Sequence, residues 1–514
     1  MIRTLAPGAP GPAAESDWLV IGAGIAGLIA ADRLARMGQR VTVVESGGER
    51  QDDESHPLNE VVMLGRDYLG ARDGRFRCLG GTSTRWGGAL IPFQAADLDP
   101  ALWPLGMEDL APFVPEVEAL FGLPPSPYDL PDLLRMADGS PPDYLARLGK
   151  WPAFGKRNVA ALLHSRIASD ANIAVWLDAH VTGFLPAEGS RIGGVVIADA
   201  AGNAHHLRAA NIAICAGAIE STRLALLLDR ACDARLLSPH GIAGRYFHDH
   251  LSSRTARIEP DDLTALNRIA GFRFEGAGMR NLRFELAGQS PLRETLPAQF
   301  NHIQFAGDEQ DGFAALRELL RAVQRRSVPA LSTLTALARN APWLTRAVWW
   351  RFAERRVLAP PDCRIDLFTV TEQVPSADSR ITLSDQHSDR FGTPLAAIDW
   401  RISEQDRTAL LASARGFAAA WPQSSLGPLG RIAPLPDAEI LAELDNSGGI
   451  YHPCGSTRMG RSAADGVVDH RCRLFGLDNV SLFSTSVLPS SGGANPTMMM
   501  ILLMLRALAN LPKP

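Results

Sequence analysis

The chain has few of the residues that form disulfide frameworks or zinc sites. Six cysteines occur among 514 residues, and none forms a CxxC pair or another zinc-binding spacing. They are Cys78, Cys215, Cys232, Cys363, Cys454 and Cys472. So sparse a set favours buried thiols in a reducing compartment. We therefore expect a cytoplasmic protein that binds no metal ion.

Long apolar runs and an excess of one charge are also missing. The apolar stretch Met498 to Leu505 is far shorter than the roughly 20 residues that cross a bilayer. The formal net charge is −5 and no long basic block occurs, so nucleic acid is not an expected partner. Residues 1–15 lack the apolar core of a secretion signal and predict a loose tail.

The residues that are present describe a folded globular protein. Apolar residues make up 46% and charged residues 21% of the chain, which excludes a disordered or fibrous class. At about 150 residues per domain, the length predicts two or three domains with ample core.

A strand, helix, strand unit stands near the start. The short apolar strand Asp17 to Ile21 leads into Gly22-Ala23-Gly24-Ile25-Ala26-Gly27 and a helical pattern that stops at Gly38. A second strand, Val41 to Val44, ends in Glu45, 18 residues after the last glycine of the motif. An acid at this place binds a ribose in dinucleotide sites. The unit therefore predicts a dinucleotide site.

Each glycine of the motif has its own physical reason. Gly22 allows the tight turn, Gly24 lets a pyrophosphate approach the backbone, and Gly27 lets the helix pack closely on the strand. The helix N-terminus supplies the anion site. These features leave open which dinucleotide binds.

Later segments indicate that this nucleotide-binding layer is interrupted and resumed. Asn211 to Cys215 is a second buried-strand pattern, followed by Ala216-Gly217 and a helix from Ile219 to Leu228. Alternating stretches between 254 and 400 predict a mainly antiparallel second sheet. They are Arg280 to Leu286, Asn301 to Phe305, Arg364 to Val370, Arg380 to Leu383 and Ala396 to Arg401.

We therefore predict an α/β fold with a discontinuous Rossmann-like nucleotide-binding domain and a second, substrate domain. The expected ranges are 14–104, 157–256 and 444–514 for the first domain, 105–156 for an excursion or lid, and 257–443 for the substrate domain.

Four separated groups of residues resemble the glucose-methanol-choline (GMC) family of flavin-dependent oxidoreductases. They are the Gly22–Gly27 motif with Glu45, the segment Leu79–Gly88, the segment Cys215–Ser221, and the C-terminal pair Tyr451–Gly460 and Ser491–Thr497. The groups follow one another in the family's order, and their motifs are nearest to the pyranose oxidase-like members. The middle third of the chain resembles the family far less.

The resemblance implies FAD as the cofactor, with NAD as the lesser candidate. Adenosine and pyrophosphate would lie at the first motif, and the flavin ring would lie against the Gly80–Gly88 loop. Some pyranose oxidase-type relatives carry a histidine in this loop that bonds to the flavin. Arg85 stands at the similar position here, so noncovalent binding is expected. The expected cofactor-binding residues are Gly22, Gly24, Gly27, Glu45, Gly80, Gly81, Thr82, Ser83, Trp86, Gly87, Gly88, Ala216, Gly217, Ser484, Thr485 and Pro496.

The resemblance also implies a catalytic pair. Oxidation of an alcohol requires a base that takes the hydroxyl proton while a hydride leaves the adjacent carbon for flavin N5. His452 matches the family's histidine, and Asn495, 43 positions later, matches its partner. Histidine can accept the proton, and the amide can hold the substrate oxygen. We interpret His248 and His250 as a satisfied or solvated pair with no catalytic role.

Residues 312–356 are locally basic and rich in tryptophan. One or two amphipathic helices are expected here. One interpretation is peripheral contact with a membrane, and the other is packing over the substrate domain or against a partner.

The predicted function is FAD-dependent oxidation of an alcohol to a carbonyl on a sugar, glycoside or polyol. Two alternatives stay open: oxidation of an apolar alcohol such as a sterol, and a noncatalytic flavin-binding subunit. The electron acceptor, the regioselectivity and the oligomeric state are not specified by the sequence.

Overall fold

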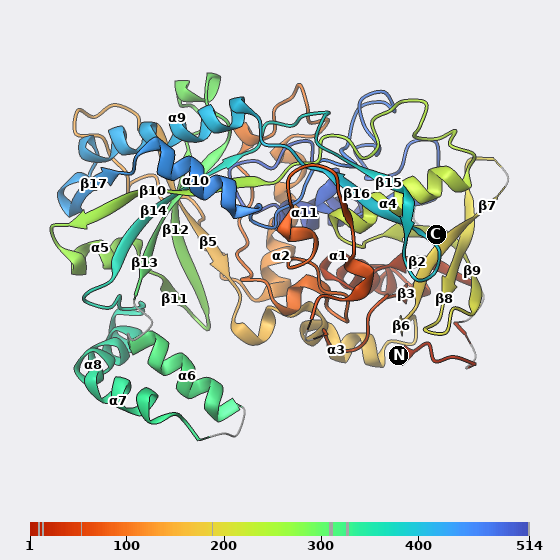
Figure 1. Ribbon diagram of the computed structural model, residues 1–514, viewed down its shortest axis with the longest axis horizontal. Helices are drawn as coiled ribbons and strands as arrows, with labels where there is room; N and C mark the ends of the chain where they lie inside the picture. Colours follow the sequence, from red (N-terminus) through yellow and green to blue (C-terminus); the bar gives the residue numbers. More distant parts are fainter. Residues whose placement is uncertain are drawn as a thin grey trace.

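The computed structural model describes residues 1–8, 11–12, 15–52, 54–187, 189–307, 312–324 and 328–511. Two large sheets form the two halves of the molecule, and both chain ends lie on the side of the first sheet (Figure 1). The α-helices are α1 (Ile25–Arg36), α2 (Val114–Phe121), α3 (Val159–Ser169), α4 (Ala218–Ala231), α5 (Leu263–Ala270), α6 (Gly312–Gln324), α7 (Leu331–Arg339), α8 (Ala341–Trp349), α9 (Glu404–Ala420), α10 (Asp437–Ser447) and α11 (Thr497–Ala509).

The first sheet is mostly parallel. Its strands run in the order β1 (Ile2–Thr4), β6 (Ile173–Leu177), β3 (Val41–Val44), β2 (Glu15–Ile21), β9 (Ala204–Ile214), β8 (Ile192–Ala198) and β7 (His180–Pro186), and β18 (Val480–Leu482) also pairs with β9. Only the β9–β8 and β8–β7 pairs are antiparallel. Segments from the start, middle and end of the chain thus share one nucleotide-binding sheet, as expected for a discontinuous Rossmann-like domain.

The first motif folds as its pattern predicts. β3 is buried at all of its positions, which is typical of a parallel strand covered on both faces. α1 follows the glycine turn, and Gly38 beyond its end has a φ of 83°. The apolar run Met498–Leu505 lies in α11, an interior helix that packs against α1. Among the described residues, no helix combines the length and apolar character that a membrane span requires.

The second sheet is antiparallel. Its order is β11 (Arg273–Glu275), β12 (Gly278–Leu286), β13 (Gln299–Ala306), β14 (Arg364–Glu372), β10 (His250–Pro260) and β17 (Gly430–Pro434), with β5 (Tyr144–Trp151) paired to β12. Alternate residues serve opposite faces. Leu282 and Phe284 join a core with Phe417 of α9, whereas Asn281 and Arg283 line the large cavity on the other face.

Three sequence predictions about the fold need correction. The alternating stretches at Arg380–Leu383 and Ala396–Arg401 do form strands, but β15 (Arg380–Ser388) and β16 (Pro394–Asp399) belong to a separate sheet, in which β16 pairs with both β15 and β4 (Val62–Met63). The expected loose tail includes β1, which pairs with β6 as the edge strand of the first sheet, and the terminal amine donates to the Ile167 and Ile173 carbonyls. β5 and β10 pair within the second sheet, although they begin outside the range 257–443.

Helices α6, α7 and α8 form a lobe that projects from one end of the second sheet (Figure 1). They pack mainly on one another around Trp343 and Trp350, so they do not cover the substrate domain. Arg325 and Arg326, which belong to the predicted basic segment, lie outside the described residues.

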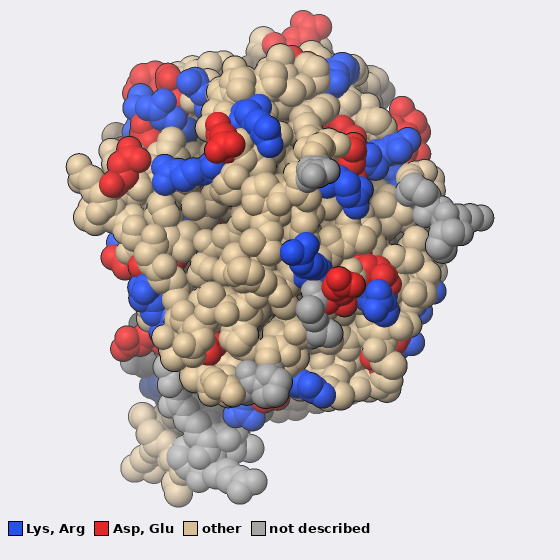
Figure 2. Space-filling view, turned by 90° about the vertical axis from the view of Figure 1, so that its right-hand side faces the viewer, with Lys and Arg blue, Asp and Glu red and all other residues tan. Residues whose placement is uncertain are grey.

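The surface on the first-sheet side carries both signs of charge. Figure 2 shows basic and acidic side chains interspersed over this face, with wide uncharged areas between them. Such a mixture produces no broad field of one sign on this face.

Candidate active site

The glycine turn after β2 is shaped partly by protein packing and partly by an open space. Gly22 has a φ of 103°, and an added Cβ there would lie 2.7 Å from the Cys215 carbonyl oxygen. A Cβ at Gly27 would lie 1.8 Å from the Gly22 oxygen, so the helix could not pack as it does. A Cβ at Gly24, in contrast, would meet no atom within 4 Å. Close packing of the backbone therefore requires glycine at positions 22 and 27, whereas Gly24 leaves open space beside the α1 N-terminus.

Glu45 closes this end of the cavity. Its carboxylate accepts the Ala23 N–H at 2.7 Å and the Gly47 N–H at 2.9 Å. Burial raises its pKa, although these hydrogen bonds oppose the shift. The carboxylate lines the cavity and can accept hydroxyl donors such as those of a ribose.

The loop from Gly80 to Gly88 turns tightly beside the first motif. Gly80, Gly81 and Gly88 have φ values of 96°, 54° and 90°, a region that favours glycine. A Cβ at Gly81 would come within 2.9 Å of the Gly24 Cα, so the two glycine turns touch. The Trp86 indole donates to the Arg157 carbonyl at 2.8 Å, which holds the ring at the wall of the cavity.

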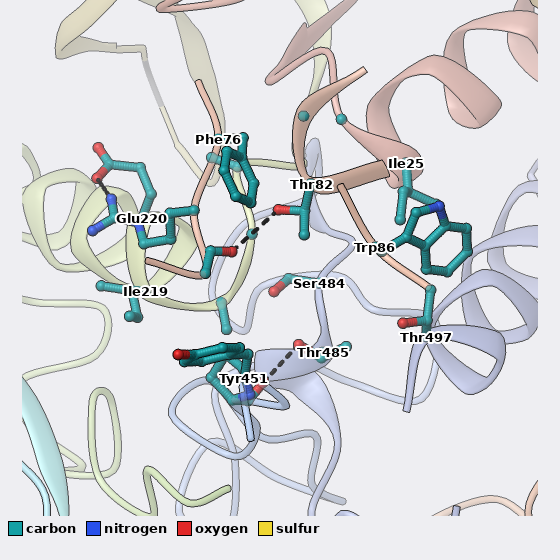
Figure 3. A pocket seen from close by; sticks show the side chains of 18 of the residues that line it. Ile25, Phe76, Thr82, Trp86, Ile219, Glu220, Tyr451, Ser484, Thr485 and Thr497 are labelled. Carbon is teal, nitrogen blue, oxygen red and sulfur yellow. Dashed lines mark hydrogen bonds and ion pairs between the residues drawn. The ribbon is translucent and has the colours of Figure 1, made fainter. Parts of the chain in front are cut away.

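The opposite wall comes from the C-terminal third. Figure 3 shows Phe76 and Thr82 facing Tyr451 and Thr485 across the pocket. The Thr485 hydroxyl donates to the Pro453 carbonyl at 2.6 Å and so holds Thr485 against the first C-terminal segment.

Glu220 of α4 is the most strongly paired acid along the cavity. Its carboxylate accepts from Arg75, Arg77 and Arg223. Burial alone would raise its pKa, but the three guanidinium groups lower the pKa well below the usual range. Glu220 therefore stays ionised and is not a proton donor. With its three arginine partners it forms one wall of the cavity.

One cavity of about 780 Å³ joins all of these walls and extends to the second sheet. The residues present fit a dinucleotide with a ring system: α1 begins without a side-chain cap, Gly24 and Gly217 leave Cβ-sized space, and Glu45 ends β3. Along the Gly80–Gly88 loop, glycines without side chains would allow a flat ring to lie directly against the backbone.

At the sheet end of this cavity, His452 and Asn495 face each other. The Asn495 Nδ2 lies 3.1 Å from His452 Nε2. Both side chains line the cavity and come from the two C-terminal segments. Burial lowers the pKa of His452 well below its usual range, with His250 and Arg283 adding to the shift, so the ring is neutral near pH 7.

His250 stands behind His452 and fixes its tautomer. His250 Nε2 lies 2.8 Å from the Gly492 carbonyl, which can only accept, so Nε2 carries the proton. Burial lowers the pKa of His250 to about 4, so its Nδ1 is a bare acceptor at neutral pH. This Nδ1 lies 3.1 Å from His452 Nδ1, which must therefore donate. His452 Nε2 is left unprotonated and directed at Asn495.

His250 is hydrogen-bonded through both ring nitrogens, as a satisfied histidine is, but nothing in the sequence indicated that it orients His452. His250 does not line the cavity, but it contacts the residue that does. His248 is different: its Nδ1 bonds the Tyr246 carbonyl at 2.7 Å and makes no contact with His452. The two histidines are two residues apart in the sequence, and the sequence could not show which one reaches the C-terminal loop.

Asp249 anchors the loop that carries His452. Its buried carboxylate accepts the backbone N–H groups of Ile450, Tyr451 and His452 and the Tyr68 hydroxyl. Tyr451 takes a φ of 67°, a conformation uncommon for a residue with a side chain. Burial raises the pKa of Asp249 to about 6, against the effect of these hydrogen bonds.

The atoms of Asp249, His250 and His452 lie within 4.8 Å of one another, close enough for a metal site. Each acceptor, however, is already used by the hydrogen bonds just described. We assign the cluster to the positioning of His452.

The comparisons with known proteins agree with this geometry. The family described as "GMC oxidoreductase" matches residues 375–503, and an "FAD binding domain" matches residues 17–56. The chain is thus similar to GMC oxidoreductases in its C-terminal part and to FAD-binding domains near its start. It is an FAD-dependent enzyme with a sheet-based second domain, as the sequence predicted.

Three relatives give the range of similarity to this chain. It is 24% identical to 6'''-hydroxyparomomycin C oxidase of Streptomyces lividus over 94% of this chain and 88% of the relative. It is 33% identical to paromamine 6'-oxidase of Streptomyces fradiae, but that match spans only 21% of this chain and 23% of the relative. An FAD-dependent oxidoreductase from Chaetomium thermophilum has the same fold, with a TM-score of 0.57, 15% identity and coverage of 96% and 98%.

Within the GMC fold, most of the predicted site residues line the one cavity. These are His452, Asn495, Gly22, Gly24, Glu45, Gly81, Thr82, Trp86, Gly87, Gly88, Ala216, Gly217, Ser484, Thr485 and Pro496. Three predicted cofactor-binding residues do not line it: Gly27, Gly80 and Ser83. Gly27 serves helix packing, and the Ser83 hydroxyl donates to the Gly80 carbonyl at 2.6 Å within the loop.

Sequence reasoning missed His250, Asp249 and Arg283. Arg283 of β12 is buried and donates from Nη2 to the Asn495 Oδ1 at 2.8 Å. This bond turns the amide so that its NH₂ group faces His452. An alternating strand pattern predicted β12, but no local signal links Arg283 to Asn495, 212 positions away.

Proposed function

We propose that this chain acts as a GMC oxidoreductase and oxidises the CH–OH group of a sugar, glycoside or polyol to a carbonyl, with His452 as the base. The observation that carries the proposal is the tautomer of His452, whose bare Nε2 points into the cavity beside the Asn495 amide. A base and a hydrogen-bond donor at one point are what alcohol oxidation requires.

FAD, when bound, supplies the acceptor for the hydride that leaves the carbinol carbon. The protein residues do the remaining work. His452 Nε2 accepts the hydroxyl proton, and His250 Nδ1 accepts from His452 Nδ1 and so keeps the ring oriented. Asn495 Nδ2 donates to the substrate oxygen and orients the carbon. Gly24 and Gly217 would leave room for the FAD pyrophosphate, and Glu45 would accept from its ribose.

A polar alcohol fits the cavity better than an apolar one. The second sheet contributes Ser252, Asn281, Arg283 and His302 to the lining around the His452 end. Burying these groups against a sterol would leave them without hydrogen bonds, at a cost of about 1–3 kcal/mol each. The full-length relative is named as an oxidase of an aminoglycoside, a sugar-based alcohol, which supports the same substrate class.

FAD binding is proposed to be noncovalent. The Gly80–Gly88 loop contains no histidine, and the Arg85 side chain donates to Gln51 at 2.7 Å. Acid precipitation tests this point: a noncovalent flavin stays in the supernatant, and a covalent one sediments with the protein.

A peripheral membrane contact through residues 312–356 is a separate proposal. Val348 and Trp349 of α8 are 58% and 57% exposed, and Phe352 just after this helix is 74% exposed; exposed Arg346 lies on α8 as well. Such a surface suits an interface with anionic lipid. Flotation with vesicles that contain phosphatidylserine tests the proposal. Phe352→Ser and Arg346→Glu should each reduce the fraction of protein that floats with the vesicles. Failure of the wild-type protein to float would reject it.

The buried thiols of Cys78, Cys215, Cys232, Cys454 and Cys472 are consistent with the cytoplasmic location that we propose.

An anaerobic substrate screen tests the main proposal. The purified protein is mixed with sugars, methyl glycosides, polyols and a solubilised sterol, and loss of the visible flavin band is followed. We expect bleaching by members of the first three groups and none by the sterol. Bleaching by the sterol alone, or by no alcohol at all, would contradict the proposed function.

A further inference from the structure

Three neutral side chains of the second sheet line the cavity with polar atoms that no protein group uses. They belong to Ser252 of β10, Asn281 of β12 and His302 of β13. Within the described part of the chain, the Ser252 hydroxyl, the Asn281 NH₂ group and both ring nitrogens of His302 have no hydrogen-bond partner. Each of these residues is half-buried, and none of the atoms is enclosed by protein. A ligand in the cavity can therefore reach them.

The charged residue that the second sheet adds to this lining, Arg283, has no donor left for a ligand. Its Nη2 donates to Asn495 Oδ1 at 2.8 Å, and its unpartnered Nε and Nη1 are enclosed by protein. The other described residues of this sheet that line the cavity are uncharged: Trp151, Phe300 and Val370. Hydrogen bonds from the sheet to a ligand must therefore come from neutral groups.

Aromatic contacts hold the His302 ring in place and leave its nitrogens free. Phe368 lies opposite His302 on β14, and the two rings stack at 5.3 Å with 10° between their planes. The Phe300 ring lies 6.0 Å away on the same strand. Burial lowers the pKa of His302 to about 4, and the charge of Arg283 adds to the shift. The ring is therefore neutral near pH 7, with one nitrogen that donates and one that accepts.

The unused groups together match a hydroxyl better than an ion. Asn281 Oδ1 accepts from the Trp151 indole at 2.7 Å, so its NH₂ group is left as a donor. The Ser252 hydroxyl can donate or accept, and the His302 ring offers one atom of each kind. A carboxylate can only accept and an ammonium group can only donate, whereas a hydroxyl does both.

His302 stands apart from the catalytic pair on the same side of the sheet. The centre of the Phe300 ring lies 6.0 Å from that of His302 and 6.3 Å from that of His250. His250 in turn contacts His452. Phe300 thus separates His302 from the group that orients the base. A hydroxyl bound at His302 is therefore a different one from the hydroxyl that loses its proton to His452.

We propose that His302 is a specificity-determining residue that binds a second hydroxyl of the substrate, so that a neutral diol or polyol is preferred to an alcohol with one hydroxyl. The inference rests on the proposed alcohol oxidation and narrows its substrate class. A substrate without the second hydroxyl would leave the donor and the acceptor of His302 unpaired against an apolar surface, which weakens binding.

The test compares alcohols with analogues that lack one hydroxyl, on the FAD-loaded enzyme. Anaerobic single-turnover bleaching is measured against alcohol concentration, which gives an apparent dissociation constant and a saturating rate. The probes are methyl glucoside, glycerol and every other sugar or polyol that bleaches the wild type. His302→Phe keeps an aromatic ring and removes both nitrogens, and His302→Gln keeps a donor and an acceptor. His206→Phe is the matched control, because His206 is exposed on β9 and does not line the cavity.

In the wild type, at least one deoxy analogue should have an apparent dissociation constant about tenfold above that of its parent, with saturating rates within about threefold. This ratio should fall to about one in His302→Phe, remain in part in His302→Gln and stay unchanged in His206→Phe. Parent and analogue are compared within one variant, so general losses of stability or FAD cancel. If His302→Phe does not fold, His302→Leu removes the same nitrogens and takes its place.

Two results would overturn the inference: equal dissociation constants for every parent and its analogues in the wild type, or the same ratio in wild type and His302→Phe. Either result leaves the proposed function standing, because the parent sugars or polyols still bleach the flavin. An enzyme that no alcohol bleaches would instead refute the proposed function, and the inference with it.

Discussion

His250 Nδ1 lies 3.1 Å from His452 Nδ1, and this contact decides which nitrogen of His452 carries the proton. The Gly492 carbonyl at the far side of His250 sets the direction of the whole chain of hydrogen bonds. The base is therefore oriented by a neutral imidazole, where other enzymes use a carboxylate or a carbonyl for the same task.

His250→Ala should slow flavin reduction about 10- to 100-fold, because His452 loses the acceptor that orients it. Its removal also deletes a group that lowers the pKa of His452, so the acid limb of the pH–rate profile should move to higher pH. His250→Gln, whose amide oxygen can accept the same bond, should recover part of the rate. An unchanged pH profile in His250→Ala would contradict the positioning role.

Gly24→Ala should impair FAD binding and leave the fold intact. An added Cβ there meets no protein atom within 4 Å, and Gly24 has a φ of −81°, which alanine adopts readily. The methyl group would instead occupy the space proposed for the pyrophosphate, and we expect FAD affinity to fall at least about tenfold. Gly155→Ala is the matched control, because its Cβ also meets nothing. Equal FAD affinity and equal Tm in both variants would argue against this cofactor position.

Glu372 should make the protein less stable as the pH rises. Its Oε2 accepts the Gly492 N–H at 2.6 Å, and burial raises its pKa to about 7. A raised folded-state pKa favours the neutral form, so the stabilisation is complete below the unfolded pKa and is lost as the pH passes 7. The difference corresponds to at most about 3 kcal/mol.

Glu372→Gln keeps the acceptor oxygen and removes the titration. We expect its free energy of unfolding, relative to wild type, to be higher at pH 8 than at pH 5, as measured by chemical denaturation at both pH values. Glu294→Gln, at an exposed glutamate, should show no such change. The same difference from wild type at both pH values would show that Glu372 does not titrate in this range.

The nucleotide half of the molecule could be predicted from the sequence because its signals are local. The turn Gly22–Gly27 and the acid Glu45 fall within one strand, helix, strand unit, and each glycine has a steric reason that its own neighbours supply. The substrate half could be predicted only in part. Alternation predicted the strands β15 and β16 but could not show which sheet they join.

The tautomer of His452 and the orientation of the Asn495 amide depend on contacts between segments that are distant in the sequence. His250 meets His452 across 202 positions, and Arg283 meets Asn495 across 212. Neither contact can be predicted from the spacing or periodicity of residues in the sequence, because each depends on how one face of the second sheet packs against the C-terminal loops. A lone histidine or arginine on a strand is consistent with many roles until this packing is known.

The most direct test of the account is single-turnover reduction of the bound flavin in His452→Ala. With an alcohol that bleaches the wild type, the rate should fall by about 10²- to 10⁴-fold while FAD content and Tm stay unchanged, since only the base is lost. His164→Ala, at an exposed histidine of α3, should reduce at the wild-type rate. Reduction of His452→Ala at a rate within about threefold of wild type, a difference below 1 kcal/mol, would contradict the claim that His452 is the base.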